Sequence, residues 1–172
     1  EAERRQLLDV AYRTVDSPIG SLLLAATTQG IVRIAFHIED HHTVLEVLAE
    51  RVSPRVLRAP ARLDEVARQL DEYFSGARRS FDLPVDLRLA HGFRRSVLDH
   101  LRDIPYGATA SYSTVAAAAG SPAAVRAVGS ACANNPVPLV VPCHRVVRSD
   151  GAIGQYLGGV ETKKALLSLE AA

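Results

Sequence analysis

The residues with the clearest potential for chemistry are Cys143, His144 and Arg145, which follow one another in the chain. They come directly after Pro142 and a branched aliphatic run at 139–141, a pattern that predicts a short core strand. Because a proline cannot donate to a β-ladder, the strand should end at Pro142. We therefore expect Cys143 where a rigid strand gives way to a loop, a common place for functional residues. Positive charge on His144 and Arg145 should favour the thiolate, the nucleophilic form of cysteine.

The chain contains two cysteines, Cys132 and Cys143. Two are too few for a disulfide framework, and no Cys-x-x-Cys pair suggests a metal site. Cys132 lies in an alanine-rich segment and is predicted to be a small buried hydrophobe. Cys143 could also be a buried structural cysteine beside surface charges. The sequence around the cysteine argues against this structural role: Asn135-Pro136 precede it, and Tyr156-Leu157-Gly158-Gly159 follow it.

In this setting, Pro142-Cys143-His144-Arg145 resembles the active site of the O6-alkylguanine-DNA alkyltransferases, the methylated-DNA–protein-cysteine methyltransferases. The resemblance covers nearly the whole chain. It includes Asp16-Ser17-Pro18-Ile19-Gly20, Glu72-Tyr73-Phe74-Ser75-Gly76, Ile104-Pro105-Tyr106-Gly107, Arg126-Ala127-Val128-Gly129 and Leu166-Leu167-Ser168-Leu169-Glu170.

This resemblance implies a DNA-repair enzyme that reverses damage directly. A methyl or other alkyl group moves irreversibly from O6 of guanine to Cys143, so each molecule acts once; O4 of thymine is a further candidate donor. The implied partner is double-stranded alkylated DNA, bound through its minor groove with the damaged nucleotide flipped out. No cofactor is implied. We expect a monomer and leave open whether it binds DNA cooperatively.

The resemblance also assigns roles to the catalytic residues. Cys143 is the acceptor, and His144 activates it through a water-bridged relay with Glu170 behind the histidine. Tyr112 helps to rotate the nucleotide and polarises the base. Asn135 ties the helix-turn-helix to the active site.

The DNA-binding residues implied by the resemblance lie on an almost bare helix. Arg126 is the finger that fills the space of the extruded nucleotide, and small residues beside it suit a minor groove about 6 Å wide. The remaining DNA-binding positions are Ala124, Ala127 and Gly129, with Tyr112. An alanine-rich helix packed tightly on its neighbours is the alternative.

The base pocket implied by the resemblance is formed by Val146, Tyr156, Leu157, Gly158 and Lys163. Tyr156 should be a pocket wall, and the backbone N–H of Leu157 a donor to guanine O6. Lys163 should brace the backbone of the active site, although a solvated surface charge is the alternative. Many relatives have a small polar residue in place of Leu157, so the preferred alkyl group stays open.

The predicted fold class is a small N-terminal α/β domain, residues 1–88, followed by a C-terminal winged helix-turn-helix-like domain, residues 89–172. Strands at 12–15, 21–26 and 31–36 are separated by short turns and predict a three-stranded antiparallel sheet. Helices are expected at 41–50 and 61–74, with a loop at 51–60. In the second half, Ser111 or Ser113 should cap a helix that ends at Gly120. Ser121 should cap the next one, with Pro122 at its first position, and a last helix should cover 160–170.

Charge and composition say little about the binding partner and the cellular location of the protein. The net charge is +1, with 12 Lys/Arg against 14 Asp/Glu at 1–91 and 8 against 5 at 92–172. A basic second half is compatible with nucleic acid but does not demand it. We find no apolar run of membrane-spanning length and no signal-peptide pattern. We therefore expect a cytoplasmic protein, nucleoid-associated if bacterial, that is not secreted and has no membrane partner.

No metal site is expected. His41 and His42 are adjacent but lack a third ligand at helical spacing, and the first half has no cysteine for the zinc that some relatives hold there.

Three other functions fit these residues less well. A cysteine hydrolase would draw its histidine from a distant segment, whereas His144 adjoins Cys143. A repair-incompetent protein that binds alkylated DNA and recruits partners would not need Cys143. A winged-helix transcription regulator would need base-contacting side chains on its reading helix, which this helix lacks.

Overall fold

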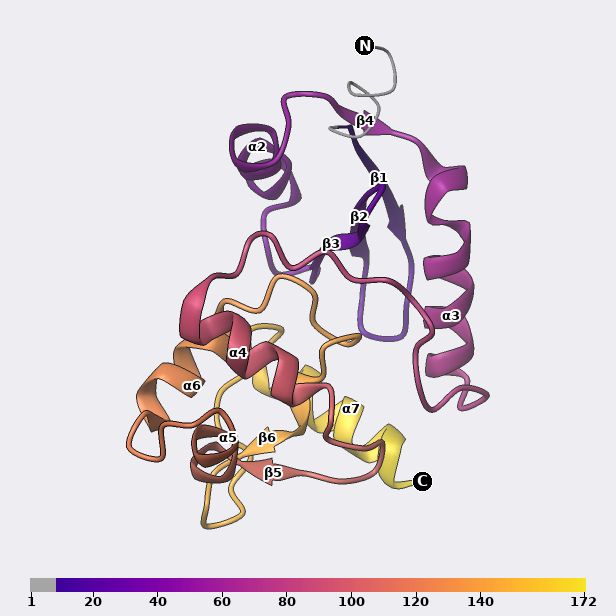
Figure 1. The fold of residues 1–172 in the computed structure, drawn as a ribbon. Coiled ribbons are helices and arrows are strands. Elements are labelled where there is room, and N and C mark those ends of the chain that lie inside the picture. The colour runs from indigo at the N-terminus through magenta and orange to yellow at the C-terminus, as the bar shows by residue number, and fades with distance from the viewer. Residues whose placement is uncertain (1–8) are drawn as a thin grey trace. The chain divides into compact units, whose positions relative to one another are not determined.

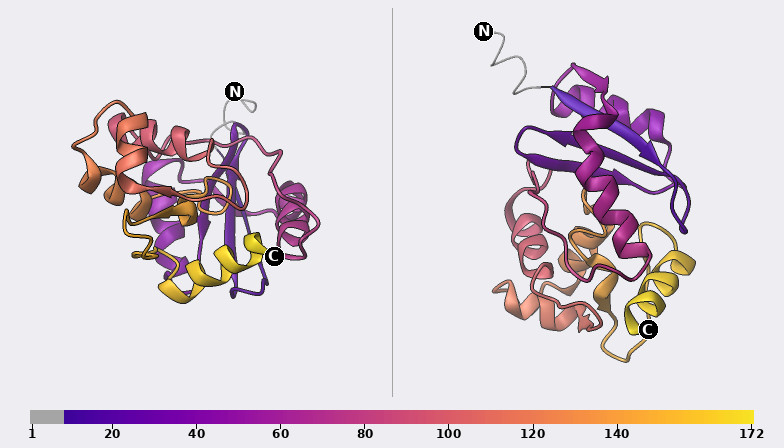
Figure 2. Two further views of the ribbon diagram at one scale, coloured as in Figure 1. Left: turned by 90° about the horizontal axis from the view of Figure 1, so that it is seen from below. Right: turned by 90° about the vertical axis from the view of Figure 1, so that its right-hand side faces the viewer.

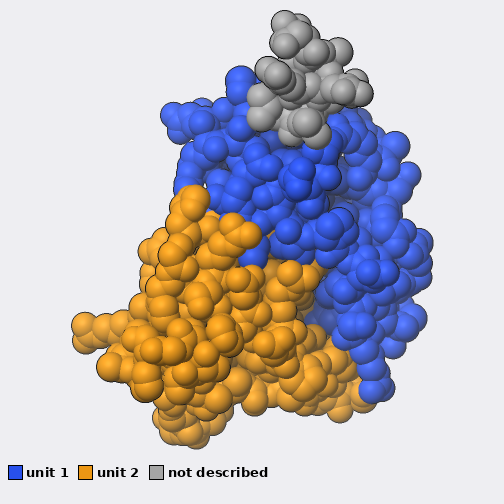
Figure 3. All heavy atoms as spheres, in the orientation of Figure 1, with its two compact units in different colours: residues 1–89 blue, residues 90–172 orange. Residues whose placement is uncertain are grey.

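The computed structural model describes residues 9–172 of the chain, so the first eight residues of the predicted N-terminal domain lie outside it. The chain divides into two compact units, Glu1–Leu89 and Ala90–Ala172, which are coloured separately in Figure 3. Within residues 9–172, no helix is both long and apolar enough to cross a membrane.

The sheet of the first unit is four-stranded and mixed, so the predicted three-stranded antiparallel sheet is wrong. β1 (Val10–Val15), β2 (Leu22–Thr27) and β3 (Gly30–Ala35) form the expected antiparallel meander. A fourth strand, β4 (Val56–Arg58), pairs parallel to β1 and gives the order β3-β2-β1-β4. It lies inside the expected loop at 51–60. With three residues at a half-exposed sheet edge, β4 carries no apolar alternation that could have predicted it.

Two helices cover the opposite faces of this sheet (Figure 1). α2 (His41–Arg51) is capped by Asp40, and its Val44 and Leu48 pack with Leu23 and Ala25 of β2. The 3-10 turn η1 (Pro60–Leu63) leads into α3 (Asp64–Phe74), which crosses the strands in the right-hand view of Figure 2. Because both faces are covered, Leu22, Leu23, Leu24 and Ala25 are all buried, and β2 shows no alternation.

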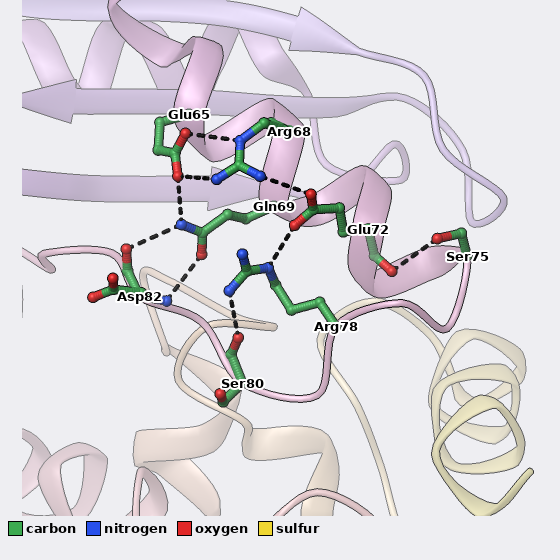
Figure 4. Close-up of polar contacts among 8 residues, drawn as sticks. All are labelled: Glu65, Arg68, Gln69, Glu72, Ser75, Arg78, Ser80 and Asp82. Atoms are coloured by element: carbon green, nitrogen blue, oxygen red, sulfur yellow. Dashed lines mark hydrogen bonds and ion pairs between the residues drawn. The ribbon is translucent and has the colours of Figure 1, made fainter.

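A polar network fastens the segment after α3 to that helix (Figure 4). Gln69 is buried and holds the backbone of Asp82 at both ends: its amide donates to the Asp82 carbonyl at 3.1 Å and accepts from the Asp82 N–H at 2.9 Å. Glu72 accepts from Arg68 at 2.7 Å and from Arg78 at 2.9 Å. The extended stretch that ends this unit is therefore fixed by side chains of α3.

The second unit is mostly helical. Its elements are α4 (Gly92–Leu101), β5 (Ala110–Ser111), α5 (Tyr112–Ala118), α6 (Val125–Ala133), η2 (Cys143–Arg145), β6 (Val146–Val147) and α7 (Val160–Ala171). β5 and β6 form a two-stranded parallel sheet. The hydroxyl of Ser111 accepts from the Thr114 N–H at 3.0 Å, which confirms Ser111 as the cap of α5.

The start of α6 was predicted wrongly. The helix begins at Val125, with Ala124 as its cap residue, and Ser121 and Pro122 precede it. The Ala124 N–H donates to the Ser121 carbonyl at 2.9 Å, so these residues form a separate turn. The fixed backbone angle of Pro122 suits position two of such a turn as well as a helix start, and the sequence does not separate the two.

The predicted strand at 139–141 does not form either. Within residues 9–172, its β-pairing is limited to an isolated bridge between Pro138 and Val141, and Leu139 has φ of 75°. Prolines at 136, 138 and 142 remove three backbone donors, so no continuous ladder is available. The residues are nevertheless buried, as their apolar character requires.

Candidate active site

Cys143 and His144 lie on a buried 3-10 turn. The turn η2 is closed by the Arg145 N–H, which donates to the Pro142 carbonyl at 3.0 Å. Cys143 is 1% exposed and His144 is fully buried. In a strand, consecutive side chains would point to opposite faces. Because the turn removes that restriction, the side chain of a histidine directly after a cysteine can act on the thiol.

Glu170 of α7 binds both residues that follow the cysteine. His144 Nε2 lies 2.7 Å from Glu170 Oε2, and Arg145 Nε donates to Glu170 Oε1 at 2.8 Å. Arg145 Nη2 donates to Oε2 at 3.0 Å, and Nη1 to the carbonyl of Ile104 at 2.7 Å. The carboxylate is therefore held by two charged or chargeable side chains in a buried setting.

This contact fixes the protonation of the histidine ring. An ionised carboxylate only accepts hydrogen bonds, so Nε2 of His144 carries the proton. Nδ1 is then the basic nitrogen. It is buried and makes no hydrogen bond to any residue of the described chain.

Electrostatics at Cys143 differ from the sequence-based expectation. Burial raises the pKa of Cys143 to about 11, although the side chain of Asn135 and the charge of Lys163 act to lower it. Burial also lowers the pKa of His144, against the opposing effect of Glu170, so the ring is neutral. The charge of Arg145 is matched by Glu170. The expected thiolate stabilised by two flanking cations is wrong, and the resting form of Cys143 is the thiol.

Asn135 clamps the loop that leads to Cys143. Its side-chain amide donates to the Val141 carbonyl at 2.9 Å and accepts from the Val137 N–H at 3.0 Å. Asn135 itself is buried. The Val141 carbonyl also accepts from the Cys143 N–H at 2.8 Å. The Asn135 amide thus satisfies the Val137 N–H, adds a second bond at Val141, and holds the loop closed.

A cavity of about 730 Å³ opens onto Cys143. Of the predicted site residues, Tyr112, Gly129, Cys143, Tyr156 and Leu157 line it. Val146, Gly158 and Lys163 do not.

Lys163 is fully buried, so the surface-charge alternative is wrong. Its ammonium donates to the carbonyls of Val146 at 2.6 Å and Gln155 at 3.2 Å. It therefore joins β6 to the loop that carries Tyr156.

Arg126 lies outside the cavity lining, on the exposed side of α6, while Ala124 and Ala127 beside it are partly buried. Val125 and Cys132 do line the cavity and were not predicted as site residues. Residues 125, 129 and 132 follow the spacing of one helix face, so helical periodicity counted from Gly129 could have found both.

Two family models match the chain. The 6-O-methylguanine DNA methyltransferase ribonuclease-like domain matches residues 10–87, and the DNA binding domain of the same family matches residues 92–172. The chain belongs to this family.

Curated relatives and solved structures agree with this membership. The methylated-DNA–protein-cysteine methyltransferase of Methanosarcina barkeri is 38% identical, with 92% of this chain and 96% of the relative covered. The constitutive enzyme of Bacillus subtilis is 39% identical, with 92% and 94% covered. The crystal structure of Mycobacterium tuberculosis OGT in complex with DNA has a TM-score of 0.83 and 37% identity, with 94% of this chain and 92% of that chain covered.

Replacing Glu170 with leucine should lower the free energy of unfolding by about 3–5 kcal/mol, because the buried Arg145 guanidinium loses its carboxylate. Urea denaturation would measure the loss. Glu161→Leu on the same helix is the matched control, since Glu161 is exposed and its ion pair is a surface one, with Lys164 at 3.4 Å. A Glu170→Leu protein as stable as this control would show that the buried pair contributes nothing.

Proposed function

We propose that this chain repairs DNA by accepting an alkyl group from O6 of guanine onto Cys143, once per molecule. The observation that carries the proposal is the buried Cys143 in the lining of a cavity, directly followed by His144, which contacts Glu170. The names of the relatives and the DNA complex of a similar structure support methylated DNA as the partner. O4 of thymine is a second candidate donor of the same chemical kind.

The geometry of DNA engagement follows from the cavity. O6 of guanine lies inside the base stack, so the nucleotide must be flipped out before a buried thiol can reach it. α5 and α6, with the small β5–β6 sheet, are the elements of a winged helix-turn-helix-like unit. The small residues of α6, Ala124, Ala127 and Gly129, suit the minor groove, and the exposed Arg126 fills the space that the extruded nucleotide leaves.

Activation of Cys143 uses His144 as a base. The unpartnered Nδ1 supports a bridging water between His144 and the thiol, because buried polar nitrogens are almost always hydrogen-bonded. The water takes the thiol proton and passes one to Nδ1. The resulting imidazolium is stabilised by Glu170, which already accepts from Nε2.

Transfer then proceeds by displacement at carbon. The sulfur attacks the alkyl carbon, the bond from that carbon to O6 breaks, and the guanine leaves as its anion and takes up a proton. Tyr112 and the backbone N–H of Leu157 stabilise O6 as its charge develops, and both residues line the cavity. The product thioether has no ready leaving group, so the protein is consumed. All these groups come from one chain, so the reaction needs only a monomer.

The competing function is a repair-incompetent protein that binds alkylated DNA and recruits partners. Such a protein would need the cavity and α6 but not an acceptor. The cysteine in the cavity, with a base and a carboxylate arranged behind it, favours transfer.

Intact mass after incubation with a short duplex containing O6-methylguanine tests the proposal directly. We expect one methyl group per chain, mapped to Cys143, and no turnover beyond that. Cys143→Ala should take up none while still binding the duplex. Methyl on Cys132, or a protein that binds the duplex but is never methylated, would favour the binder instead.

Arg126→Ala should slow repair of the duplex far more than repair of the free base O6-methylguanine. The free base needs no extrusion, so a residue that fills the space of the extruded nucleotide is irrelevant to it. Rates on both substrates, measured on the same preparation, decide this. Equal losses on duplex and free base would remove Arg126 from nucleotide flipping.

His144→Ala should slow methyl transfer by about 10²–10⁴ near neutral pH, the usual contribution of a general base. With a thiol pKa of about 11 in the folded protein, the thiolate is scarce at neutral pH and its fraction rises as pH increases. Below that pKa the rise is roughly tenfold per pH unit, so the gap between variant and wild type should narrow in alkali. Single-turnover rates across this range give the measurement, and a gap that stays constant with pH would mean that His144 is not the base.

A further inference from the structure

Two thiols line the cavity, and the methyl-transfer reaction uses one of them. Cys132 lies on α6 and is 8% exposed, and Cys143 lies on η2. Both border the same space, together with Tyr112, Val125 and Gly129. Burial raises the pKa of Cys132, and the nearby charge of an ionised Cys143 raises it further. Both cysteines therefore line one cavity, into which an alkyl chain carried by Cys143 can extend toward Cys132.

We propose that Cys132 is a second acceptor, which acts when the alkyl group on guanine carries a leaving group on its second carbon. A 2-haloethyl lesion is the simplest member of this class. The product would be a dithioether in which an ethylene unit joins Cys143 to Cys132. The inference rests on the proposed function, since Cys143 must take the first bond.

The steps balance with no other reactant. The sulfur of Cys143 displaces guanine from the first carbon, which leaves a 2-chloroethyl thioether on the protein. That sulfur then expels chloride from the second carbon and forms a three-membered episulfonium ring. The thiol of Cys132 attacks one ring carbon, the carbon–sulfur bond to the positive sulfur opens, and the thiol proton leaves to water. Chloride and a proton are released, and both cysteines end as thioethers.

Cys132 is the best nucleophile available to that ring. The other candidate side chains that line the cavity are oxygen nucleophiles: Tyr112, Ser149, Asp150 and Tyr156. Sulfur is intrinsically the stronger nucleophile toward carbon. Lys163 does not line the cavity, and its ammonium is tied to two backbone carbonyls. An ethylene unit also gives two sulfurs more reach than a disulfide, whose sulfur atoms must be about 2.05 Å apart.

Burial makes Cys132 selective. Its raised pKa keeps it a thiol, so it reacts slowly with alkylating agents in solution. An episulfonium formed on Cys143 is held inside the same cavity, so Cys132 attacks it intramolecularly, at an effective concentration raised by orders of magnitude. The bridge would divert this electrophile from the bound DNA, whose own nucleophiles would otherwise form a protein–DNA cross-link.

The full chain is treated with 1,2-dibromoethane at alkaline pH, where a fraction of Cys143 is thiolate and can take up a 2-bromoethyl group without DNA. The alkylated chains are then examined by intact mass and peptide mapping. We expect an added mass of C2H2, an ethylene unit replacing two thiol hydrogens, mapped to Cys132 and Cys143. Cys132→Ala and Cys132→Ser should instead gain C2H4O, the hydroxyethyl product of attack by water. Scoring only alkylated chains makes the product ratio independent of any loss in folding. Ser130→Ala, on the same helix but outside the cavity lining, should bridge as wild type does.

The outcomes separate the inference from the function on which it rests. Protein first methylated by an O6-methylguanine duplex should form no bridge, because Cys143 is blocked. Methyl uptake by wild type with C2H4O as its main dibromoethane product would overturn the second acceptor alone. A bridge from Cys143 to any other residue would also overturn the second acceptor.

Absence of methyl uptake from the duplex would overturn the proposed function, whatever product dibromoethane gives. With duplex present, Cys132→Ala should give more DNA-linked protein on a denaturing gel than wild type, and equal amounts would contradict the diversion.

Discussion

The second unit depends on one buried carboxylate. Glu170 holds the neutral ring of His144 and the charged guanidinium of Arg145 in a setting where either would be costly to leave unpaired. Through Arg145 it also reaches the carbonyl of Ile104, just beyond α4. A buried ion pair is weak evidence of net stability, since its desolvation cost can exceed the attraction. What it gives here is orientation: α7 is fixed to the turn that carries Cys143, and within residues 9–172 the basic nitrogen of His144 has no hydrogen-bond partner.

The same burial sets the chemical state of the cysteine. A thiol with a pKa of about 11 is almost unionised at neutral pH, so the protein does not expose a reactive thiolate to the solution. For a protein that can act only once, this is an advantage, because a thiolate lost to an unrelated electrophile could not be recovered. Reactivity then has to arise at the moment of substrate binding, which requires a base next to the sulfur. The buried thiol and the neutral histidine are thus two parts of one arrangement.

The sequence predicted the chemical residues of the site better than it predicted the backbone that carries them. The meander, α2 and the cap at Ser111 followed from apolar alternation and capping residues, whose signals are local. β4 was missed because three edge residues carry no pattern. The bidentate contact of Arg145 with Glu170 was missed because a pairing across 25 residues leaves no trace in spacing. Cys132 was predicted to serve packing alone, since its place in the same cavity lining as Cys143 depends on the tertiary arrangement.

The predicted strand before Cys143 shows why the backbone was harder to predict. Branched aliphatic residues there reflect burial, but the prolines exclude the ladder that burial usually accompanies. The chain instead adopts a left-handed conformation at Leu139, which costs a non-glycine residue on the order of 1–3 kcal/mol. Asn135 offsets that cost by bonding the backbone at Val137 and Val141 on either side of it. After the turn that carries Cys143, Lys163 also holds the backbone, by donating to the carbonyl of Val146. Cys143 is therefore positioned by buried polar side chains that bind irregular backbone. Motifs of polar residues can locate a site of this kind in a sequence, whereas hydrophobic periodicity predicts the wrong backbone for it.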